Sequence, residues 1–186
     1  MIFEQIMGNY LKILERFKGK SAGIFIDEAN LFYSQKFLGW HTDWKKVLEF
    51  FDQFYKIKIA QYYMGMPLKR ENYERNILIK NRLQKDGFKV ITKPLKKIYL
   101  DGQKKDFIYK CNFDVEITRD AIRSLDKIDL VLLASSDSDF IGLRDDVISQ
   151  EKGFIFVCFE YNVAWEIRRS YHLFFEEIKE KVQYRR

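Results

Sequence analysis

Apolar and polar residues follow two different periods along this chain, and their succession predicts an α/β fold. Short apolar runs at 22–27, 57–64, 88–92, 129–135 and 153–159 are typical of parallel strands buried on both faces. Between them, apolar residues recur at helical spacing over about 44–55, 69–86, 113–125 and 138–151, and Gly87 is placed to cap the second of these helices. Strands alternating with helices predict a mainly parallel sheet covered on both faces, a three-layer sandwich.

Three segments lie outside this alternation. Residues 98–109 carry an Asp101-Gly102 turn signal between two β-prone runs, which predicts an inserted β-hairpin. Residues 1–18 predict an amphipathic helix rather than a signal peptide, and residues 161–186 predict one or two closing helices. Together these elements predict a single domain over residues 1–186, with its core at about 20–160.

Composition narrows the class of protein without identifying it. The net charge of +6 is a modest indication of a polyanionic partner. Cys111 and Cys158 lack the spacing of a zinc or redox site and are typical of buried thiols in a reducing compartment. Because no apolar run reaches the length of a membrane span, we expect a cytoplasmic protein with no membrane partner. With only two histidines, imidazole catalysis and histidine-rich metal sites are disfavoured.

Acidic residues occur where the predicted sheet would present a ligand site, at the carboxyl ends of its strands. Asp27 ends the first strand, with Asn30 one helical turn later, and Asp137 and Asp139 follow the strand at 129–135. Asp114 begins the helix before that strand. Converging carboxylates repel one another unless a cation is bound, and Mg²⁺ or Mn²⁺ prefers such oxygen ligands. Each residue could instead cap a helix or a turn, so the evidence for a site is their coincidence.

Three segments that carry these residues resemble the motifs of the NYN-domain family, a group of PIN-like nucleases. They are FIDEANLFYSQKFLGWHTDW, KCNFDVEITRDAI and LLASSDSDFIGL, in the expected order over residues 22–143. The resemblance implies a PIN-like domain that holds Mg²⁺ or Mn²⁺ and hydrolyses single-stranded or structured RNA. It assigns the metal-binding and catalytic roles to Asp27, Asp114, Asp137 and Asp139, with Asn30 orienting Asp27 or a bound water. Supporting roles fall to Asp120, Ser135 and Ser136.

Two residues depart from the family pattern. Glu28 and Ser136 stand where the family usually has glycine. Glu28 adds a charge that could join the ligands or face solvent. Ser136 puts a side chain at a tight turn, where glycine reaches backbone conformations that other residues avoid. Neither change removes an acid, so the resemblance still implies activity.

The segment 93–110 is the strongest candidate for binding RNA. It carries six lysines against Asp101 and Asp106, with Tyr99, Phe107 and Tyr109 interleaved; the lysines are Lys93, Lys96, Lys97, Lys104, Lys105 and Lys110. This composition suits a nucleic-acid strand whose phosphates bind lysine and whose bases stack on rings. A solvated hairpin whose lysines protect an exposed edge is the alternative. Lys110, four residues before Asp114, is the basic residue expected to reach the scissile phosphate.

Other functions explain the same residues less well. A non-catalytic RNA-binding or regulatory module on the same fold would keep the lysines, and fold alone does not guarantee turnover. An aspartyl phosphatase is disfavoured because Asp27 is followed by Glu28, Ala29 and Asn30, without the second acid two residues on. Neither a G-x-G-x-x-G motif nor a Walker P-loop is present, which disfavours a nucleotide-binding Rossmann enzyme. The aromatic residues near the end of the chain predict core positions or a partner surface, such as that of a homo-oligomer; they are Trp165, Tyr171, Phe174 and Phe175.

Overall fold

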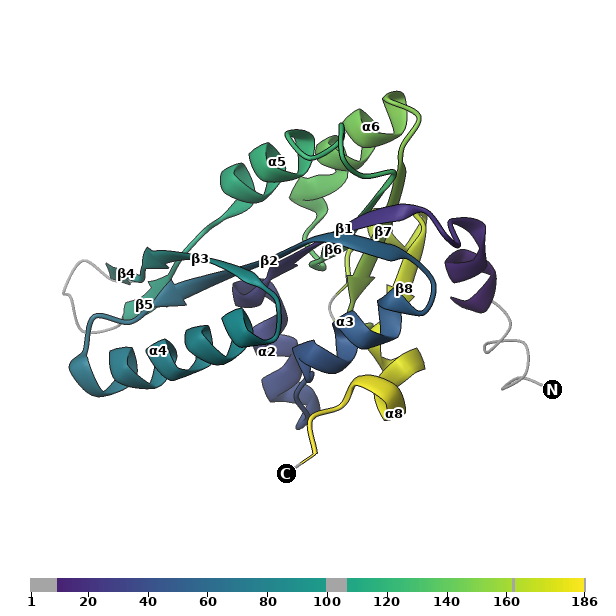
Figure 1. Ribbon diagram of the computed structural model, residues 1–186. Helices are drawn as coiled ribbons and strands as arrows, with labels where there is room; N and C mark the ends of the chain where they lie inside the picture. Colours follow the sequence, from purple (N-terminus) through teal and green to yellow (C-terminus); the bar gives the residue numbers. More distant parts are fainter. Residues whose placement is uncertain (1–9, 100–106, 162, 186) are drawn as a thin grey trace.

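A six-stranded, all-parallel sheet forms the centre of the molecule in the computed structural model, which describes residues 10–99, 107–161 and 163–185 (Figure 1). The strand order is β3-β2-β1-β6-β7-β8. The strands are β1 (Ser21–Asp27), β2 (Lys56–Met66), β3 (Lys89–Pro94), β6 (Leu130–Ala134), β7 (Gly153–Cys158) and β8 (His172–Phe174). Parallel pairing throughout places the carboxyl ends of all six strands at one edge.

Helices cover both faces of this sheet. One face packs against α2 (Glu28–Leu38), α3 (Trp44–Asp52), α4 (Arg70–Lys85), the short helices η2 (Phe175–Ile178) and α8 (Lys179–Val182), and the helical residues 10–16. The other packs against α5 (Asp114–Ile122), α6 (Ile141–Ser149), the short helix η1 (Ser138–Phe140) and α7 (Trp165–Arg168). Figure 1 shows α5 and α6 above the sheet and α2, α3, α4 and α8 below it. The predicted three-layer α/β sandwich is therefore confirmed.

The central strands are continuous apolar runs because both of their faces are buried. Every residue of β6 and β7 is buried, and alternate residues enter opposite cores. Leu132 packs in the core beside α2 and α3, whereas Leu133 packs in the core beside α5 and α6. Burial of this apolar surface is the main contribution to folding.

The C-terminal segment differs most from the prediction, because it contains a sixth strand, β8, between α7 and η2. The core extends into this segment: Phe175 is fully buried, which agrees with a core position, whereas Trp165 is 61% exposed. Cys158 is buried, but Cys111 is only half-buried. Within the described residues, no helix combines the length and the apolar character that crossing a bilayer requires.

The predicted hairpin consists of β4 (Lys96–Tyr99) and β5 (Phe107–Lys110), paired antiparallel. It extends outward beyond the ends of β2 and β3 (Figure 1), and every residue of both strands is exposed. The predicted Asp101-Gly102 turn and the first half of the predicted N-terminal helix lie outside the described residues.

The connections of the sheet determine where a ligand site can form. From β1 the chain proceeds to β2 and β3 on one side, and it then crosses over to β6, β7 and β8 on the other. The direction in which successive strands are added to the sheet therefore reverses between β1 and β6, while the strands themselves stay parallel. In open parallel sheets, such a switch point leaves a crevice beyond the carboxyl ends of the two strands. Asp27 ends β1, and Ser135 directly follows β6.

Candidate active site

Asp27 is a buried acid at the end of β1, with only 6% of its surface exposed. Its side chain caps α2: the backbone N–H of Asn30 donates to Oδ1 over 3.5 Å, and the Ser135 hydroxyl donates to Oδ2 over 3.3 Å. The pKa of Asp27 is raised to about 6, chiefly by burial; the negative charges of Asp114 and Asp137 contribute to the rise, and the two hydrogen bonds oppose it. Asp27 therefore lies within the electrostatic reach of both acids.

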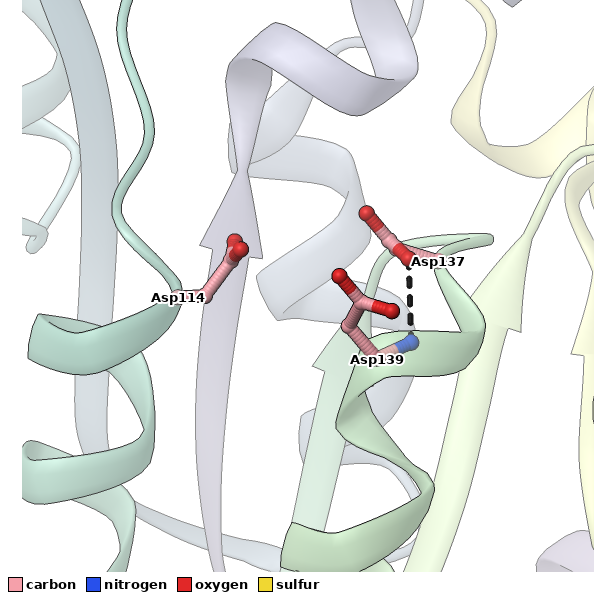
Figure 2. A group of neighbouring side chains, drawn as sticks. All are labelled: Asp114, Asp137 and Asp139. Carbon is pink, nitrogen blue, oxygen red and sulfur yellow. Dashed lines mark hydrogen bonds between the residues drawn. The ribbon is translucent and has the colours of Figure 1, made fainter.

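Asp114, Asp137 and Asp139 converge on one point in front of this strand edge. One carboxylate oxygen from each lies within 4.8 Å of the others. Figure 2 shows that Asp114, from the start of α5, faces the pair that comes from the loop and helix after β6. Three carboxylates at this separation repel one another unless a cation or a proton is shared between them.

The local structure after β6 fixes the two later acids. Asp137 is the N-cap of η1, and its Oδ1 accepts a hydrogen bond from the backbone N–H of Asp139 over 3.0 Å (Figure 2). Asp137 therefore does cap a helix, as the sequence allowed, but this capping does not exclude binding of a metal ion. A carboxylate has several lone pairs, and one capping bond leaves oxygen atoms free for another partner.

Asn112 holds Asp114 in place, a role that was not predicted from the sequence. Its side-chain amide donates to Oδ2 of Asp114 over 2.6 Å, and its Oδ1 accepts from the Asp114 backbone N–H over 2.7 Å. Asparagine just before a helix is a typical capping residue, so its spacing could have revealed this role. The pKa of Asp114 is raised, chiefly by burial and also by the charges of Asp137 and Asp139, while Asn112 and Lys110 oppose the rise.

A hydrogen-bonded bridge joins the ends of β1 and β6. Oδ1 of Asn30 accepts from the backbone N–H of Ser136 over 2.8 Å and from its hydroxyl over 2.7 Å. The Ser135 hydroxyl, which donates to Asp27, accepts from the backbone N–H of Asp137 over 3.3 Å. Asn30, Ser135 and Ser136 therefore position the segment that carries Asp137. Among the described contacts, Asn30 donates to Asp27 through its backbone N–H, and its side-chain amide donates to none of the four aspartates.

The two departures from the family pattern have different outcomes. Ser136 is not strained: among the described residues other than glycine, only Glu151 has a positive φ, and the Ser136 hydroxyl is used in the bridge. Glu28 begins α2 and is outside the three-acid cluster. Burial, and then the charge of Asp27, raises the pKa of Glu28 to about 7.

Asp120 is placed away from the cluster. It pairs with Arg119 at 2.7 Å, and its Oδ2 lies 3.0 Å from the hydroxyl of Tyr63. Tyr63 is the partner of Asp27 in the register between β1 and β2. Asp120 thus supports the strand next to Asp27 and makes no hydrogen bond to any of the four site aspartates in the described structure.

The lysines of the 93–110 segment fall into three groups. Lys93 is already engaged within the protein, since its Nζ lies 2.5 Å from Glu116 and 3.2 Å from the carbonyl oxygen of Asn112. Lys96, Lys97 and Lys110 are exposed on the hairpin, where Lys96 lies opposite Lys110. Lys104 and Lys105 lie outside the described residues.

The donors at this point fit a hard divalent cation. The cluster offers only carboxylate oxygens from three different residues, the ligand type that Mg²⁺ and Mn²⁺ prefer. A cation there would also offset the carboxylate repulsion that adds to the effect of burial on the pKa values of Asp27 and Asp114.

Comparison with known proteins shows the family. The model of the NYN domain matches residues 21–177, which include the strands, the bridge and all four aspartates. The chain belongs to the NYN-domain family. The NYN fold is of the PIN-like, nuclease type, and the resemblance of the three motifs is thereby confirmed.

Two relatives extend this comparison. The chain is 27% identical over 154 residues to the low amplitude and bright protein LabA of Synechococcus elongatus, covering 83% of this chain and 82% of LabA. A crystal structure of a protein of unknown function from Vibrio parahaemolyticus matches with a TM-score of 0.71 and 20% identity, covering 90% of this chain and 98% of that one. The latter likeness shows the shared fold.

Proposed function

We propose that this NYN domain is a metal-dependent ribonuclease whose active site is the acidic edge of the sheet. The observation that carries the proposal is the convergence of Asp114, Asp137 and Asp139 within 4.8 Å, beside the buried Asp27. Carboxylates held this close repel one another, and a bound cation would remove that repulsion.

In this proposal, Asp114, Asp137 and Asp139 hold Mg²⁺ or Mn²⁺, and Asp27 completes the site from the strand side. The cation supplies water activation and neutralises the charge that develops on a scissile phosphate. Ser135 and Asn30 hold the segment that carries Asp137 beside Asp27, and Asn112 orients Asp114. These contacts are hydrogen bonds between rigid elements, so they pre-organise the acids before a substrate arrives.

RNA fits the distribution of charge around the site. The acidic cluster alone repels a polyphosphate, but Lys110 is close enough to Asp114 to lower its pKa, and Lys96 lies opposite Lys110. Exposed lysines beside an acidic metal site attract phosphates to the point where they are cut. We therefore propose Lys96, Lys97 and Lys110 as the main phosphate contacts and give Lys93, which pairs with Glu116, a lesser part.

The test is cleavage of labelled single-stranded RNA with Mn²⁺ or Mg²⁺, with EDTA as a control. Asp137→Asn should fold normally and lose cleavage by orders of magnitude. Asp52→Asn is the matched control, because Asp52 is an exposed acid at the end of α3, near the opposite edge of the sheet. Cleavage by Asp137→Asn at the rate of the unmodified protein would refute the site.

A non-catalytic RNA-binding module is the second candidate, and the exposed hairpin is the observation that favours it. Its lysines and aromatic residues would bind RNA whether or not the acids cut it. The same experiment separates the two functions: binding that weakens steeply with salt, without cleavage in either metal, would support the module.

A further inference from the structure

The hairpin is a ribbon with two chemically different faces. The β4–β5 register pairs Tyr99 with Phe107 and Lys97 with Tyr109, which places all four side chains on one face, the aromatic face. The opposite face carries the pairs Lys96–Lys110 and Ile98–Ile108. The three rings form a row: Tyr99 and Phe107 have centroids 6.3 Å apart, and those of Phe107 and Tyr109 are 5.5 Å apart.

No described part of the protein covers this row of rings. Tyr99, Phe107 and Tyr109 are 43%, 42% and 41% exposed. A two-stranded hairpin without a packed face is at best marginally stable in water, and three exposed rings on one face are an unfavourable choice for solvent. The arrangement favours a partner that contributes flat, apolar surface of its own.

The charges on the ribbon indicate what kind of partner this is. Nζ of Lys97 lies 3.8 Å from the Phe107 ring centroid and 4.7 Å from that of Tyr99, so a cation stands within the row of rings. A partner must therefore present flat rings and negative charge together. An unpaired RNA strand does so, because each nucleotide carries a base and a phosphate.

The base of the ribbon is joined to the acidic site by a short connection between β5 and α5. Lys110 ends β5, Asn112 follows two residues later and orients Asp114, and Lys93 ties this connection to α5 through Glu116 and the Asn112 carbonyl. A strand lying along the ribbon would thus be led toward Asp114.

We propose, on the basis of the ribonuclease function above, that the aromatic face stacks the bases of a single-stranded RNA and delivers its backbone to the aspartates. The substrate class is then unpaired RNA and not a duplex. In a duplex the bases stack on one another, and their ring faces are not accessible to side chains.

The test compares two ligands that differ only in their bases. A labelled single-stranded RNA of about ten nucleotides and an abasic strand of the same length are titrated in EDTA by fluorescence anisotropy, and the same RNA annealed to its complement is titrated as the duplex control. The triple variant Tyr99→Leu, Phe107→Leu and Tyr109→Leu keeps apolar side chains but removes the rings. The matched control, Ile98→Ala with Ile108→Ala, alters the opposite face of the same ribbon at equal exposure.

The unmodified protein should bind the RNA more tightly than the abasic strand, and the triple variant should lose at least about tenfold in RNA affinity while its abasic affinity is unchanged. The isoleucine control should keep the preference for bases. Tyr99→Phe with Tyr109→Phe retains the rings and should bind like the unmodified protein. Unchanged abasic affinity of the triple variant excludes misfolding as the cause of its loss.

Three results would overturn the proposal: equal affinity of the triple variant and the unmodified protein for RNA, an equal loss for both ligands, or equal affinity of the unmodified protein for duplex and single strand. A change from dimer to monomer in the triple variant, with RNA affinity retained, would assign the face to a second copy of the chain. If one of these results occurs but metal-dependent cleavage is observed, the aromatic-face proposal fails and the ribonuclease function is retained. If binding depends on the bases but no cleavage occurs, only the proposed catalysis is refuted.

Discussion

The bridge between Asn30 and Ser136 gives the most quantitative prediction. Asn30→Ala removes an acceptor of two hydrogen bonds, of 2.8 and 2.7 Å, and leaves the Ser136 backbone N–H without its partner. At roughly 1 kcal/mol for each bond, the loss is about 2 kcal/mol, and the higher helix propensity of alanine within α2 returns about 0.5 kcal/mol. We expect a net destabilisation of about 1.5 kcal/mol.

Urea unfolding followed by circular dichroism measures this difference, with an unchanged m-value as the condition for comparison. Ser136→Ala is the matched control, since it removes only the hydroxyl and keeps the backbone bond, and it should cost about 1 kcal/mol. Because the bridge positions Asp137, Asn30→Ala should also slow RNA cleavage in Mn²⁺ under conditions in which the variant is still folded. Equal stability of Asn30→Ala and the unmodified protein, or a larger loss for Ser136→Ala, would contradict the reasoning.

Two further predictions concern phosphate contacts and pH. Lys96→Ala with Lys110→Ala should lower the slope of log affinity against log salt for single-stranded RNA by about 1.4, or 0.7 for each lysine; an unchanged slope would remove both from the contact. Asp129 accepts hydrogen bonds from Ser21 and pairs with Lys152, and the Ser21 hydroxyl is the main cause of its lowered pKa. A carboxylate with a lowered folded pKa stabilises above its unfolded pKa of about 3.9 and loses this contribution as pH falls through the folded value. Asp129→Ala should therefore cost about 1 kcal/mol at neutral pH in urea unfolding, with the gap narrowing below about pH 4; a gap independent of pH would contradict this.

The parts of the fold that followed from the sequence are those in which local pattern and tertiary burial agree. β6 and β7 are buried along their whole length, β1 is buried from Ala22 onward, and the second half of β2 is buried in the same way. β8 escaped prediction because it has three residues, of which only Leu173 is buried. α2 was not predicted because exposed aromatic residues interrupt its apolar face, as in the case of Tyr33 and Phe37, both 66% exposed.

The candidate site was predictable where strand order alone places residues together. Asp27 and Asp137 follow neighbouring parallel strands, so their proximity is a consequence of topology. The pairing of Lys93 with Glu116 and the contact of Asp120 with Tyr63 join residues far apart in the chain. Such contacts depend on the position of α5 over the sheet, which the sequence pattern does not specify.

We propose above all that Asp114, Asp137 and Asp139 hold a divalent cation. Isothermal titration calorimetry of the metal-free protein with Mn²⁺ measures this binding directly, without requiring the natural RNA. We predict one site, weakened by at least about tenfold in Asp137→Asn and unchanged in Asp52→Asn. Equal Mn²⁺ affinity in Asp137→Asn and the unmodified protein, or no binding by the unmodified protein, would contradict the account.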